Sequence, residues 1–342
     1  MKAVIFNEHG PEDVLVFTEV PEPEIADDEV LVRVKACALN HLDLWIRGGL
    51  PGIKFPLPHI LGSDISGVVE RVGRVVRNTK PGDEVMLAPG LSCMHCEFCL
   101  SGHDNLCAEY NSIGYRTPGG YAEFVKVPSA NVLPKPPNVS FAEAASFPLV
   151  FLTAWHMLVD RVRLSPGETL LVHAAGSGVG IAAIQIGKLL GARVFATAST
   201  NEKLEKAKAL GADECINYQE QDFLDVVRKL TNKRGVDVVF EHTGEATWEK
   251  SVRSLTKGGR LVTCGATSGY QGNLDIRYLF SRQISLHGSY MGSKSELMEV
   301  AKFFTAGKLK AVVDRTFPLE GAADAHRALK SRAQFGKIVL EP

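Results

Sequence analysis

Residues 169–192 read TLLVHAAGSGVGIAAIQIGKLLGA, and this stretch decides the fold. It starts as an apolar run typical of a strand, passes through small residues, and continues directly with the three-to-four-residue periodicity of a helix. Further apolar runs and helical stretches alternate after it: ARVFATAS, NEKLEKAKALGA, ECINY, QDFLDVVRKLTNKRG, VDVVFEHTG and GRLVTCG. Strands that are apolar throughout and alternate with helices predict an α/β fold with a doubly wound parallel sheet. We place this Rossmann domain at residues 151–289.

Short alternating runs dominate the chain before this domain. KAVIF, VLVRVKACAL, SGVVERVG and YAEFVKVP are separated by turns rich in Pro and Gly, which predicts an antiparallel β domain at residues 1–150. After residue 289 the chain carries SELMEVAKFFTAGKL, AVVDRTFPL, ADAHRALKSR and GKIVLEP, which alternate between helical and strand-like patterns. We expect residues 290–342 to return and complete the first domain, so the Rossmann domain is an insertion.

Length and composition narrow the class of protein. A chain of 342 residues is long enough for two domains, and 45% hydrophobic with 23% charged residues is typical of a folded globular protein. The formal net charge is -1, from 38 basic and 39 acidic residues, so the basic footprint of a nucleic-acid-binding protein is missing. We find neither a signal peptide nor an apolar stretch long enough to span a membrane. We therefore expect a cytoplasmic protein that acts on a small molecule, with no nucleic acid or membrane partner.

The turn between strand and helix in residues 169–192 predicts a dinucleotide site. A Gly-rich turn at a helix N-terminus lets a pyrophosphate approach backbone N–H groups. The motif is an AGSGVG variant of the usual GxGxxG pattern. Its predicted cofactor-binding residues are Gly176, Ser177, Gly178, Val179 and Gly180.

The end of the next strand favours NADPH over NADH. An NAD site usually places Asp or Glu there, on the ribose hydroxyls, whereas this chain reads Ala198, Ser199, Thr200, Asn201. We expect the 2′-phosphate to be held by Ser199, Thr200, Lys203 and Tyr218. NADH stays open as an alternative, and Lys203 can equally be an exposed helix charge.

Four of the seven cysteines crowd into CMHCEFCLSGHDNLC. Cys93, Cys96, Cys99 and Cys107 are spaced so that a short loop can offer four thiolates to one metal ion, and four thiolates leave no open position for substrate. We predict one structural zinc ion per chain; an iron–sulfur cluster and loosely reactive thiols are the alternatives. Cys37, Cys215 and Cys264 lie in apolar runs, where we expect buried thiols.

The β domain, the inserted Rossmann domain and the cysteine loop together resemble the medium-chain dehydrogenase/reductase superfamily along the whole chain. The resemblance implies a GroES-like first domain and a nicotinamide cofactor. In the zinc-dependent alcohol dehydrogenases of this superfamily a second, catalytic zinc has three protein ligands, and the matching positions here are Asn40, Ser63 and Leu149. These residues do not form the expected ligand set. LNHLDLWIRGG and FPLVFLTAWHML instead resemble the quinone oxidoreductase branch.

The resemblance and the missing ligands together favour an electrophilic acceptor. Oxidation of an alcohol needs a bound metal to stabilise the developing alkoxide, whereas a quinone or α,β-unsaturated carbonyl is already electrophilic. The leading hypothesis is therefore NADPH-dependent reduction of a quinone or enone without a catalytic metal. The alternatives are an NAD(P)-dependent alcohol dehydrogenase with an altered or absent catalytic zinc, and a redox-inactive NADPH-binding sensor or RNA-binding structural protein.

The resemblance also suggests roles for particular residues. We expect Asn40 and Thr153 beside the nicotinamide, and Lys337 in contact with the cofactor. The candidate catalytic residues are Asn40, His41, Asp43 and Asp64, for which general acid chemistry and an unconventional metal site are both open, with Asp43 expected to pair with Arg47. The stretch LDIRYLFSRQISLHGSYM is expected to pair subunits into a homodimer or homotetramer.

Overall fold

The computed structural model describes all 342 residues and divides into two compact units. Unit 1 comprises Met1–Leu149 and Ser293–Pro342, and unit 2 comprises Val150–Gly292. The sequence placed these divisions at residues 150 and 289. No helix is both long enough and apolar enough to cross a membrane.

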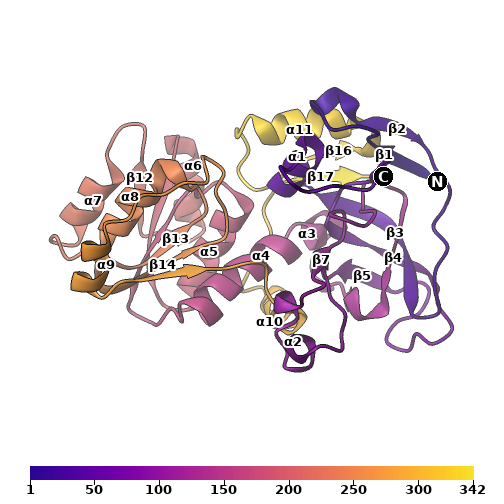
Figure 1. The fold of residues 1–342 in the computed structure, drawn as a ribbon, viewed down its shortest axis with the longest axis horizontal. Helices are drawn as coiled ribbons and strands as arrows, with labels where there is room; N and C mark the ends of the chain where they lie inside the picture. Colours follow the sequence, from indigo (N-terminus) through magenta and orange to yellow (C-terminus); the bar gives the residue numbers. More distant parts are fainter. The chain divides into compact units, whose positions relative to one another are not determined.

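Unit 2 is built on a six-stranded sheet in the order β12-β11-β10-β13-β14-β15, with every neighbouring pair parallel. Its helices follow the strands and pack on the sheet (Figure 1). The order places β10 beside both β11 and β13, which is the doubly wound arrangement. Its elements are β10 (Thr169–Val172), α5 (Gly178–Leu189), β11 (Arg193–Ala198), α6 (Asn201–Ala209), β12 (Glu214–Asn217), α7 (Phe223–Leu230), β13 (Val236–Glu241), α8 (Glu245–Ser254), β14 (Leu255–Thr263), α9 (Ile276–Arg282) and β15 (Ser285–Gly288), preceded by α4 (Pro148–Trp155) and the π-helical turn η4 (His156–Arg161).

Unit 1 is built on a seven-stranded sheet, with β16-β17-β3-β4-β5-β9 in order and β8 paired to β3. Its core lies between this sheet and the segments that cover it, and includes Phe6, Ile46, Ile65 and Tyr121. Its strands are β1 (Lys2–Ile5), β2 (Val16–Glu19), β3 (Glu29–Ala38), β4 (Asp64–Val72), β5 (Glu84–Leu87), β6 (Gly90–Leu91), β7 (Asn111–Ser112), β8 (Phe124–Pro128), β9 (Val132–Pro134), β16 (Val313–Pro318) and β17 (Lys337–Glu341). Its helices are α1 (His41–Gly48), α2 (Glu97–Leu100), α3 (Phe141–Ala145), α10 (Lys294–Thr305) and α11 (Ala322–Lys330), with 3₁₀ turns at Glu12–Val14, Asp104–Leu106, Ser129–Asn131 and Leu319–Gly321.

The last fifty residues complete the sheet of unit 1. Strand β17 pairs antiparallel with β3, with Val339 opposite Ala38, and β16 pairs parallel with β17. The yellow β17 and α11 accordingly lie beside the indigo N-terminal segments in Figure 1. Phe304 of α10 stacks on Phe147 with a ring-centroid distance of 3.9 Å. The predicted fold class, a GroES-like β domain with an inserted Rossmann domain, is confirmed.

The strand predicted at GRLVTCG is present but starts earlier than expected, and the expected burial of two cysteines is wrong. Strand β14 begins at Leu255, ahead of the apolar run at Gly259 that predicted it, and its pairing with β13 is irregular near Val236. Cys37 is buried as expected, but Cys215 is exposed and Cys264 is partly exposed. Cys215 lies on β12, at the edge of the sheet, where apolar alternation does not guarantee burial.

Candidate functional site

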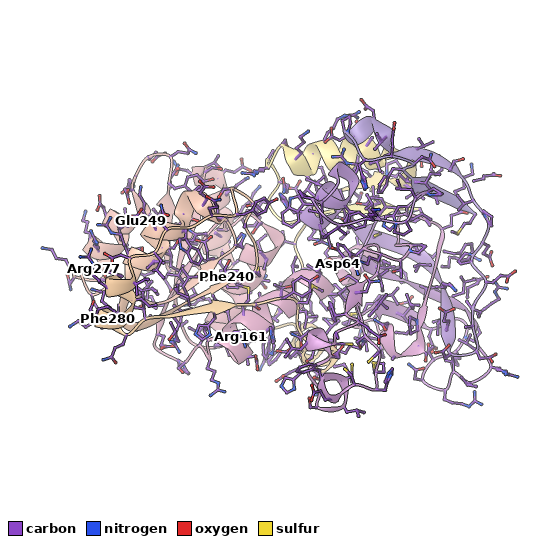
Figure 2. All side chains as sticks on the ribbon, viewed as in Figure 1. Asp64, Arg161, Phe240, Glu249, Arg277 and Phe280 are labelled. Carbon is purple, nitrogen blue, oxygen red and sulfur yellow. The ribbon has the colours of Figure 1, made fainter.

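Asn40, Asp64 and Lys337 form a buried polar group in unit 1, which we call the Lys337 cluster. Asn40 follows β3, Asp64 begins β4, and Lys337 begins β17. Because Ala38 pairs with both Asp64 and Val339, the register of the sheet brings the three side chains together. Asp64, labelled in Figure 2, is fully buried, and Asn40 and Lys337 are 7% and 5% exposed.

Direct hydrogen bonds join the members of the cluster. Lys337 Nζ donates to Asn40 Oδ1 at 2.6 Å and to Asp64 Oδ2 at 3.0 Å. Asn40 Nδ2 donates to the same Asp64 oxygen at 3.0 Å, and the other oxygen accepts from the backbone N–H of Leu149 at 2.8 Å. The charges of the ammonium and the carboxylate compensate each other inside the protein, and the orientation of the Asn40 amide is determined by its neighbours.

Asp43 lies in the first turn of α1 and holds the backbone around this cluster. Its side chain accepts from the N–H of Asn40 at 2.7 Å and from the N–H of Gly62 at 3.2 Å. Burial raises the pKa of Asp43 to about 6, although the two backbone hydrogen bonds and the nearby Lys337 ammonium act to lower it. A carboxyl group with this pKa changes its charge close to neutral pH.

The predicted pairing of Asp43 with Arg47 is wrong. Arg47 donates to Glu12 Oε1 at 2.9 Å and to the carbonyl of Gly10 at 2.6 Å, so its guanidinium is directed away from the first turn of α1. Asp43 instead closes a capping box with Asn40. The Asp43 carboxylate therefore binds the backbone at the start of α1 and does not bind Arg47, four residues further along the helix.

A chain of buried hydrogen bonds that the sequence did not reveal runs from Arg47 through His326 to Tyr121. Arg47 Nε donates to His326 Nδ1 at 3.2 Å, and His326 Nε2 lies 3.0 Å from the Tyr121 hydroxyl. Burial, together with the Arg47 charge, lowers the pKa of His326 to about 3, so the ring is neutral and Nε2 carries the proton. Burial, followed by the charge of Asp43, raises the pKa of Tyr121. No local pattern links these residues, because they lie far apart in the chain.

Two further residues singled out by the sequence lie on the same elements. Ser63 is fully buried, and its hydroxyl has no hydrogen-bond partner. His41 begins α1 and is partly exposed, with its ring centroid 6.3 Å from that of Trp45. The hydrogen bonds that join Asn40, Asp64 and Lys337 do not involve either residue.

In unit 2 the Gly-rich turn connects β10 to the N-terminus of α5. Ser177 caps the helix, since its Oγ accepts from the N–H of Gly180 at 3.0 Å. A Cβ at Gly180 would lie 2.5 Å from the carbonyl oxygen of Ala174, so only glycine fits there without a shift of the backbone. Gly178 and Val179 form the first helical turn, and Gly176 precedes the cap. The turn therefore presents backbone N–H groups at a helix N-terminus, as anion binding requires.

The end of β11 has a nearby carboxylate that the sequence did not predict. Thr200 caps α6 by accepting from the N–H of Lys203 at 3.3 Å, Ser199 precedes it, and the N–H of Tyr218 donates to the carbonyl of Ala198 at 3.1 Å. The sequence suggested that no acid lies here. The fold brings in Glu220, which accepts from Asn201 at 3.2 Å and from Asn217 at 2.8 Å. This carboxylate comes from the segment after β12, so the residues at the end of β11 give no sign of it.

A second buried network lies at the ends of β10 and β13. Glu241 accepts from Thr247 Oγ1 and Ser251 Oγ, both at 2.8 Å, and from the N–H of Thr243 at 2.6 Å. His173 Nε2 lies 2.9 Å from Ser251 Oγ. Burial raises the pKa of Glu241, but His173 and these hydrogen bonds outweigh burial and hold it below the usual value. The network fixes the strand end from which the Gly-rich turn starts.

Thr153, predicted beside the nicotinamide, is buried in α4.

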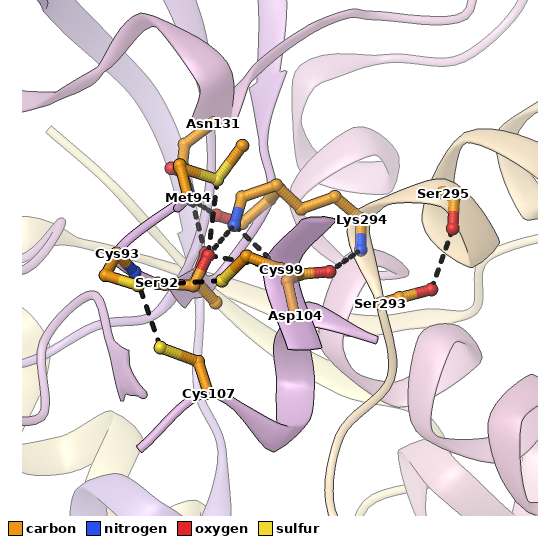
Figure 3. A network of polar contacts seen from close by, with 12 residues as sticks. Ser92, Cys93, Met94, Cys99, Asp104, Cys107, Asn131, Ser293, Lys294 and Ser295 are labelled. Carbon is orange, nitrogen blue, oxygen red and sulfur yellow. Dashed lines mark hydrogen bonds and ion pairs between the residues drawn. The ribbon is translucent and has the colours of Figure 1, made fainter. Parts of the chain in front are cut away.

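The four cysteines of residues 93–107 converge in unit 1. Figure 3 labels three of them, Cys93, Cys99 and Cys107. The four Sγ atoms all lie within 4.8 Å of one another, with 3.5 Å between Cys96 and Cys99 and 3.9 Å between Cys93 and Cys99. Thiolates bound tetrahedrally to zinc at about 2.3 Å are about 3.8 Å apart, so the group fits one zinc ion. The hydrogen bond from the N–H of His95 is the main cause that lowers the pKa of Cys93 to about 6. The N–H of Cys99 acts to lower the pKa of Cys96, but burial and hydrogen bonds with the neighbouring thiols raise it to about 11.

The return segment supports the cysteine loop. Lys294 Nζ donates to Asp104 Oδ2 at 2.9 Å and to Ser92 Oγ at 3.1 Å, and the Lys294 N–H donates to Asp104 Oδ1 at 3.0 Å (Figure 3). Asp104 and Lys294 are both largely buried. The start of α10 therefore holds the loop in place from a distant part of the sequence.

Comparisons with known proteins agree with this organisation. The alcohol dehydrogenase GroES-like domain matches residues 26–137, and the zinc-binding dehydrogenase family matches residues 178–306. An alcohol dehydrogenase of Geobacillus stearothermophilus is 35% identical and a quinone oxidoreductase of Sus scrofa is 31% identical. The alignment with the alcohol dehydrogenase covers 94% of this chain and 95% of that relative. The alignment with the quinone oxidoreductase covers 98% of this chain and 96% of that relative. A solved structure described as an NAD-dependent alcohol dehydrogenase is 52% identical, with a TM-score of 0.97 and 100% of both chains covered.

The fold, the cysteine loop and the Gly-rich turn define an NAD(P)-dependent oxidoreductase. The chain belongs to the medium-chain dehydrogenase/reductase superfamily.

Proposed function

We propose that the chain reduces a quinone or an α,β-unsaturated carbonyl with NADPH and uses no catalytic metal ion. The observation that carries this proposal is the buried Lys337 ammonium, 2.6 Å from Asn40 Oδ1 and 3.0 Å from Asp64 Oδ2. Two of the three positions that match catalytic zinc ligands hold Asn40 and Leu149, and the Leu149 side chain has no atom that can bind a metal ion. The Lys337 ammonium lies between Asn40 and Asp64 instead.

The donor set does not suit a catalytic zinc ion. Zinc in proteins prefers thiolate, imidazole and carboxylate ligands. Both available acceptor atoms, Asn40 Oδ1 and Asp64 Oδ2, already accept from Lys337. A divalent ion there would compete with the Lys337 ammonium for the same oxygen atoms, and the two positive charges would repel each other. The proposed reaction therefore uses no metal ion at this site.

The Lys337 cluster can position and polarise a carbonyl group. Asn40 Nδ2 uses one N–H on Asp64, and we assign the second to the acceptor carbonyl or the nicotinamide carboxamide. Lys337 has three N–H groups, two of which are used within the cluster, so the third can support negative charge that develops on the acceptor. NADPH supplies a hydride when bound. His41, Asp43 and Asp64 are then positioning or proton-supplying residues, and Asp43 has the pKa suited to proton exchange near neutral pH.

Unit 2 provides the residues proposed to bind NADPH. The pyrophosphate fits the N–H groups of Gly176 to Gly180, and the 2′-phosphate fits the N-terminus of α6 with Ser199, Thr200, Lys203 and Tyr218. We assign Thr153 to the nicotinamide in the same proposal. Glu220 is the competing feature, because a carboxylate near these residues favours the ribose hydroxyls of NADH.

A coenzyme and acceptor panel tests the proposal. We expect steady oxidation of NADPH with quinones or enones, faster than with NADH at equal concentration, and negligible oxidation of primary alcohols. Tight NADPH binding with no turnover on any acceptor would contradict the proposal and favour a redox-inactive nucleotide-binding role. Faster turnover with NADH would contradict only the assignment of the phosphate-binding residues.

Alcohol oxidation is the second candidate, favoured by the similarity to the NAD-dependent alcohol dehydrogenase structure at 52% identity. In that case NAD⁺-dependent oxidation of an alcohol would exceed enone reduction. It would also require a group other than a zinc ion to stabilise the alkoxide, and Lys337 is the candidate on the chain.

Unit 2 also offers a surface for self-association. Ile276 and Phe280 on α9 are 70% and 66% exposed, and Phe280 lies at the periphery of the unit (Figure 2). Strand β15, next along the chain, is the last strand of the sheet and leaves one edge unpaired. We propose that two copies pair through α9 and β15, which sedimentation or mass photometry would test.

A further inference from the structure

Ala174 is the strained residue at the start of the Gly-rich turn in unit 2. It lies two residues beyond β10, and its φ of 46° is in the left-handed region. Alanine rarely adopts this conformation, because its Cβ then lies too close to the following carbonyl oxygen. Backbone strain of this kind persists where surrounding contacts hold it, and it concentrates at functional sites. The contacts that hold Ala174 are therefore of interest.

Hydrogen bonds fix the peptide planes on both sides of Ala174. Before it, His242 Nε2 donates to the carbonyl of His173 at 2.9 Å. After it, the Ala174 carbonyl accepts from the Ser177 N–H at 2.9 Å, and the next backbone N–H donates to the carbonyl of Thr197 at 2.8 Å. The relative orientation of two successive peptide planes is set by φ and ψ of the residue between them. Of these three hydrogen bonds, the one from His242 comes from a side chain.

Glu241 holds His242 in place. Glu241 ends β13 and is fully buried, and its Oε1 accepts from the N–H of Thr243 at 2.6 Å and from the N–H of Gly244 at 3.1 Å. The backbone after His242 is thus tied to the end of the strand. Burial lowers the pKa of His242, so the ring is neutral, and Nε2 carries the proton because its partner is a carbonyl.

The turn is accessible to a ligand, whereas His242 is not. Residues 177–179 at the start of α5 are partly exposed, but His242 is only 8% exposed. The Ala174 carbonyl also packs against the first turn of α5, since a Cβ at Gly180 would lie 2.5 Å from it. A change in the conformation of Ala174 therefore moves the backbone that a bound anion would contact.

We propose that His242 is a positioning residue for the dinucleotide. Its hydrogen bond keeps Ala174 left-handed, and this conformation directs the N–H groups of residues 176–180 at the pyrophosphate. The inference rests on the proposed function, because it requires a dinucleotide at the Gly-rich turn. Without the donor, Ala174 can relax to the right-handed conformation that alanine prefers. Only the fraction of molecules that stays left-handed then binds tightly, so the apparent Kd rises as this fraction falls.

The test replaces His242 and measures nucleotide affinity apart from turnover. His242→Leu removes the donor and keeps a side chain of similar size. The preference of alanine against the left-handed conformation corresponds to a factor of about ten, so we expect the NADPH Kd to rise about tenfold. Fluorescence titration well below the melting temperature measures it. His242→Gln keeps an N–H that can reach the same carbonyl, and its Kd should stay close to the wild-type value.

Thr231→Val is the matched control for the loss of a side-chain hydrogen bond in unit 2. Thr231 follows α7, and its Oγ1 donates to the carbonyl of Val227 at 2.7 Å and accepts from the N–H of Gly235 at 3.0 Å. We expect this variant to melt at a lower temperature and to keep the wild-type NADPH Kd. It shows whether destabilisation of the unit alone weakens nucleotide binding.

Glycine at position 174 separates positioning from general support of the structure. Glycine adopts the left-handed conformation about as readily as the right-handed one. Ala174→Gly added to His242→Leu should therefore recover most of the lost affinity. It restores no contact of His242, so a general loss of structure would not be recovered in this way.

Three outcomes would overturn the role of His242. They are an unchanged NADPH Kd in His242→Leu, a raised Kd that Ala174→Gly does not recover, and failure of His242→Leu to fold, which would mean that His242 supports the whole unit. If the wild-type chain binds NADH more tightly, the same variants are compared with NADH. Binding of neither nucleotide by the wild type would defeat the proposed function and this inference with it, whereas tight wild-type binding with an unchanged Kd in His242→Leu contradicts the His242 assignment alone.

Discussion

At the scale of residues, the chemistry of unit 1 depends on side chains that meet only when its sheet has formed. The sequence singled out Asn40, Asp64 and Lys337, but it assigned Lys337 to the cofactor alone. Nζ of Lys337 bonds both other residues although 273 positions separate it from Asp64. Strand register determines that contact, and local pattern carries no information on the register between β3 and β17. For the same reason, the chain from Arg47 through His326 to Tyr121 had no sequence signal.

Replacement of Lys337 should affect stability and turnover together. Lys337→Met leaves the buried Asp64 carboxylate without its cation, and we expect a loss of about 3–5 kcal/mol in the free energy of unfolding. We also expect kcat/KM to fall at least tenfold, because the polarising charge is gone. Urea denaturation and steady-state kinetics measure the two effects.

Two variants check the origin of the Lys337 effect. Addition of Asp64→Asn to Lys337→Met should recover part of the lost stability, since no buried charge then lacks a partner. Lys330→Met is the surface control: the side chain of Lys330 is 66% exposed and 3.2 Å from Glu12, so we expect a change below about 1 kcal/mol. Equal losses for Lys337→Met and Lys330→Met would contradict the role of the buried charge.

The raised pKa of Asp43 predicts a particular pH dependence of stability. Because its pKa rises from 3.8 to about 6 in the folded state, folding favours the protonated form. The stabilisation is complete below about pH 4 and is lost as the pH rises through about 6, a change of up to about 3 kcal/mol. Asp43→Asn cannot titrate, so the difference in unfolding free energy between variant and wild type should change across this range. Parallel pH profiles for the two proteins would contradict the assignment.

At the scale of elements, apolar periodicity predicted strand and helix positions well, whereas the chemistry at their ends was less predictable. The Gly-rich turn was recognisable because small residues between a strand and a helix form a local signal. Glu220 was missed because the fold, not the sequence, brings it to Asn201 at the end of β11. Strand β14 begins at Leu255, ahead of its apolar run, because pairing with β13 extends it.

Substitution in the Gly-rich turn should affect cofactor binding more than folding. In Gly180→Ala the new Cβ meets the carbonyl of Ala174 at 2.5 Å, so the turn must shift and its N–H groups must move. We expect the NADPH Kd to rise at least tenfold, as measured by fluorescence titration. Gly187→Ala is a control on the same helix, where the Cβ meets side chains of Leu170 and Val194. It should lower the melting temperature and leave the Kd near the wild-type value.

At the scale of the whole molecule, the insertion of one unit into the other was predictable because the β-rich first part would otherwise be small, and residues 290–342 carry further strand-like runs. Their partners were not predictable: the Asp104–Lys294 pair at 2.9 Å connects the cysteine loop to the start of α10 across 190 positions. The superfamily is shown by relatives that align along nearly all of the chain. These relatives are described as alcohol dehydrogenases and as quinone oxidoreductases, so the chemistry at Asn40 and Lys337 must decide between the two activities.

The measurement that tests the central claim most directly is metal content with activity before and after chelation. The four-cysteine group accounts for one zinc ion per chain, and the Lys337 cluster accounts for none. We predict about one zinc per chain, and NADPH-dependent reduction of quinone or enone that persists when a chelator leaves the structural ion in place. Two zinc ions per chain, or activity that is lost on chelation and restored by added zinc while the protein stays folded, would contradict a metal-free reduction.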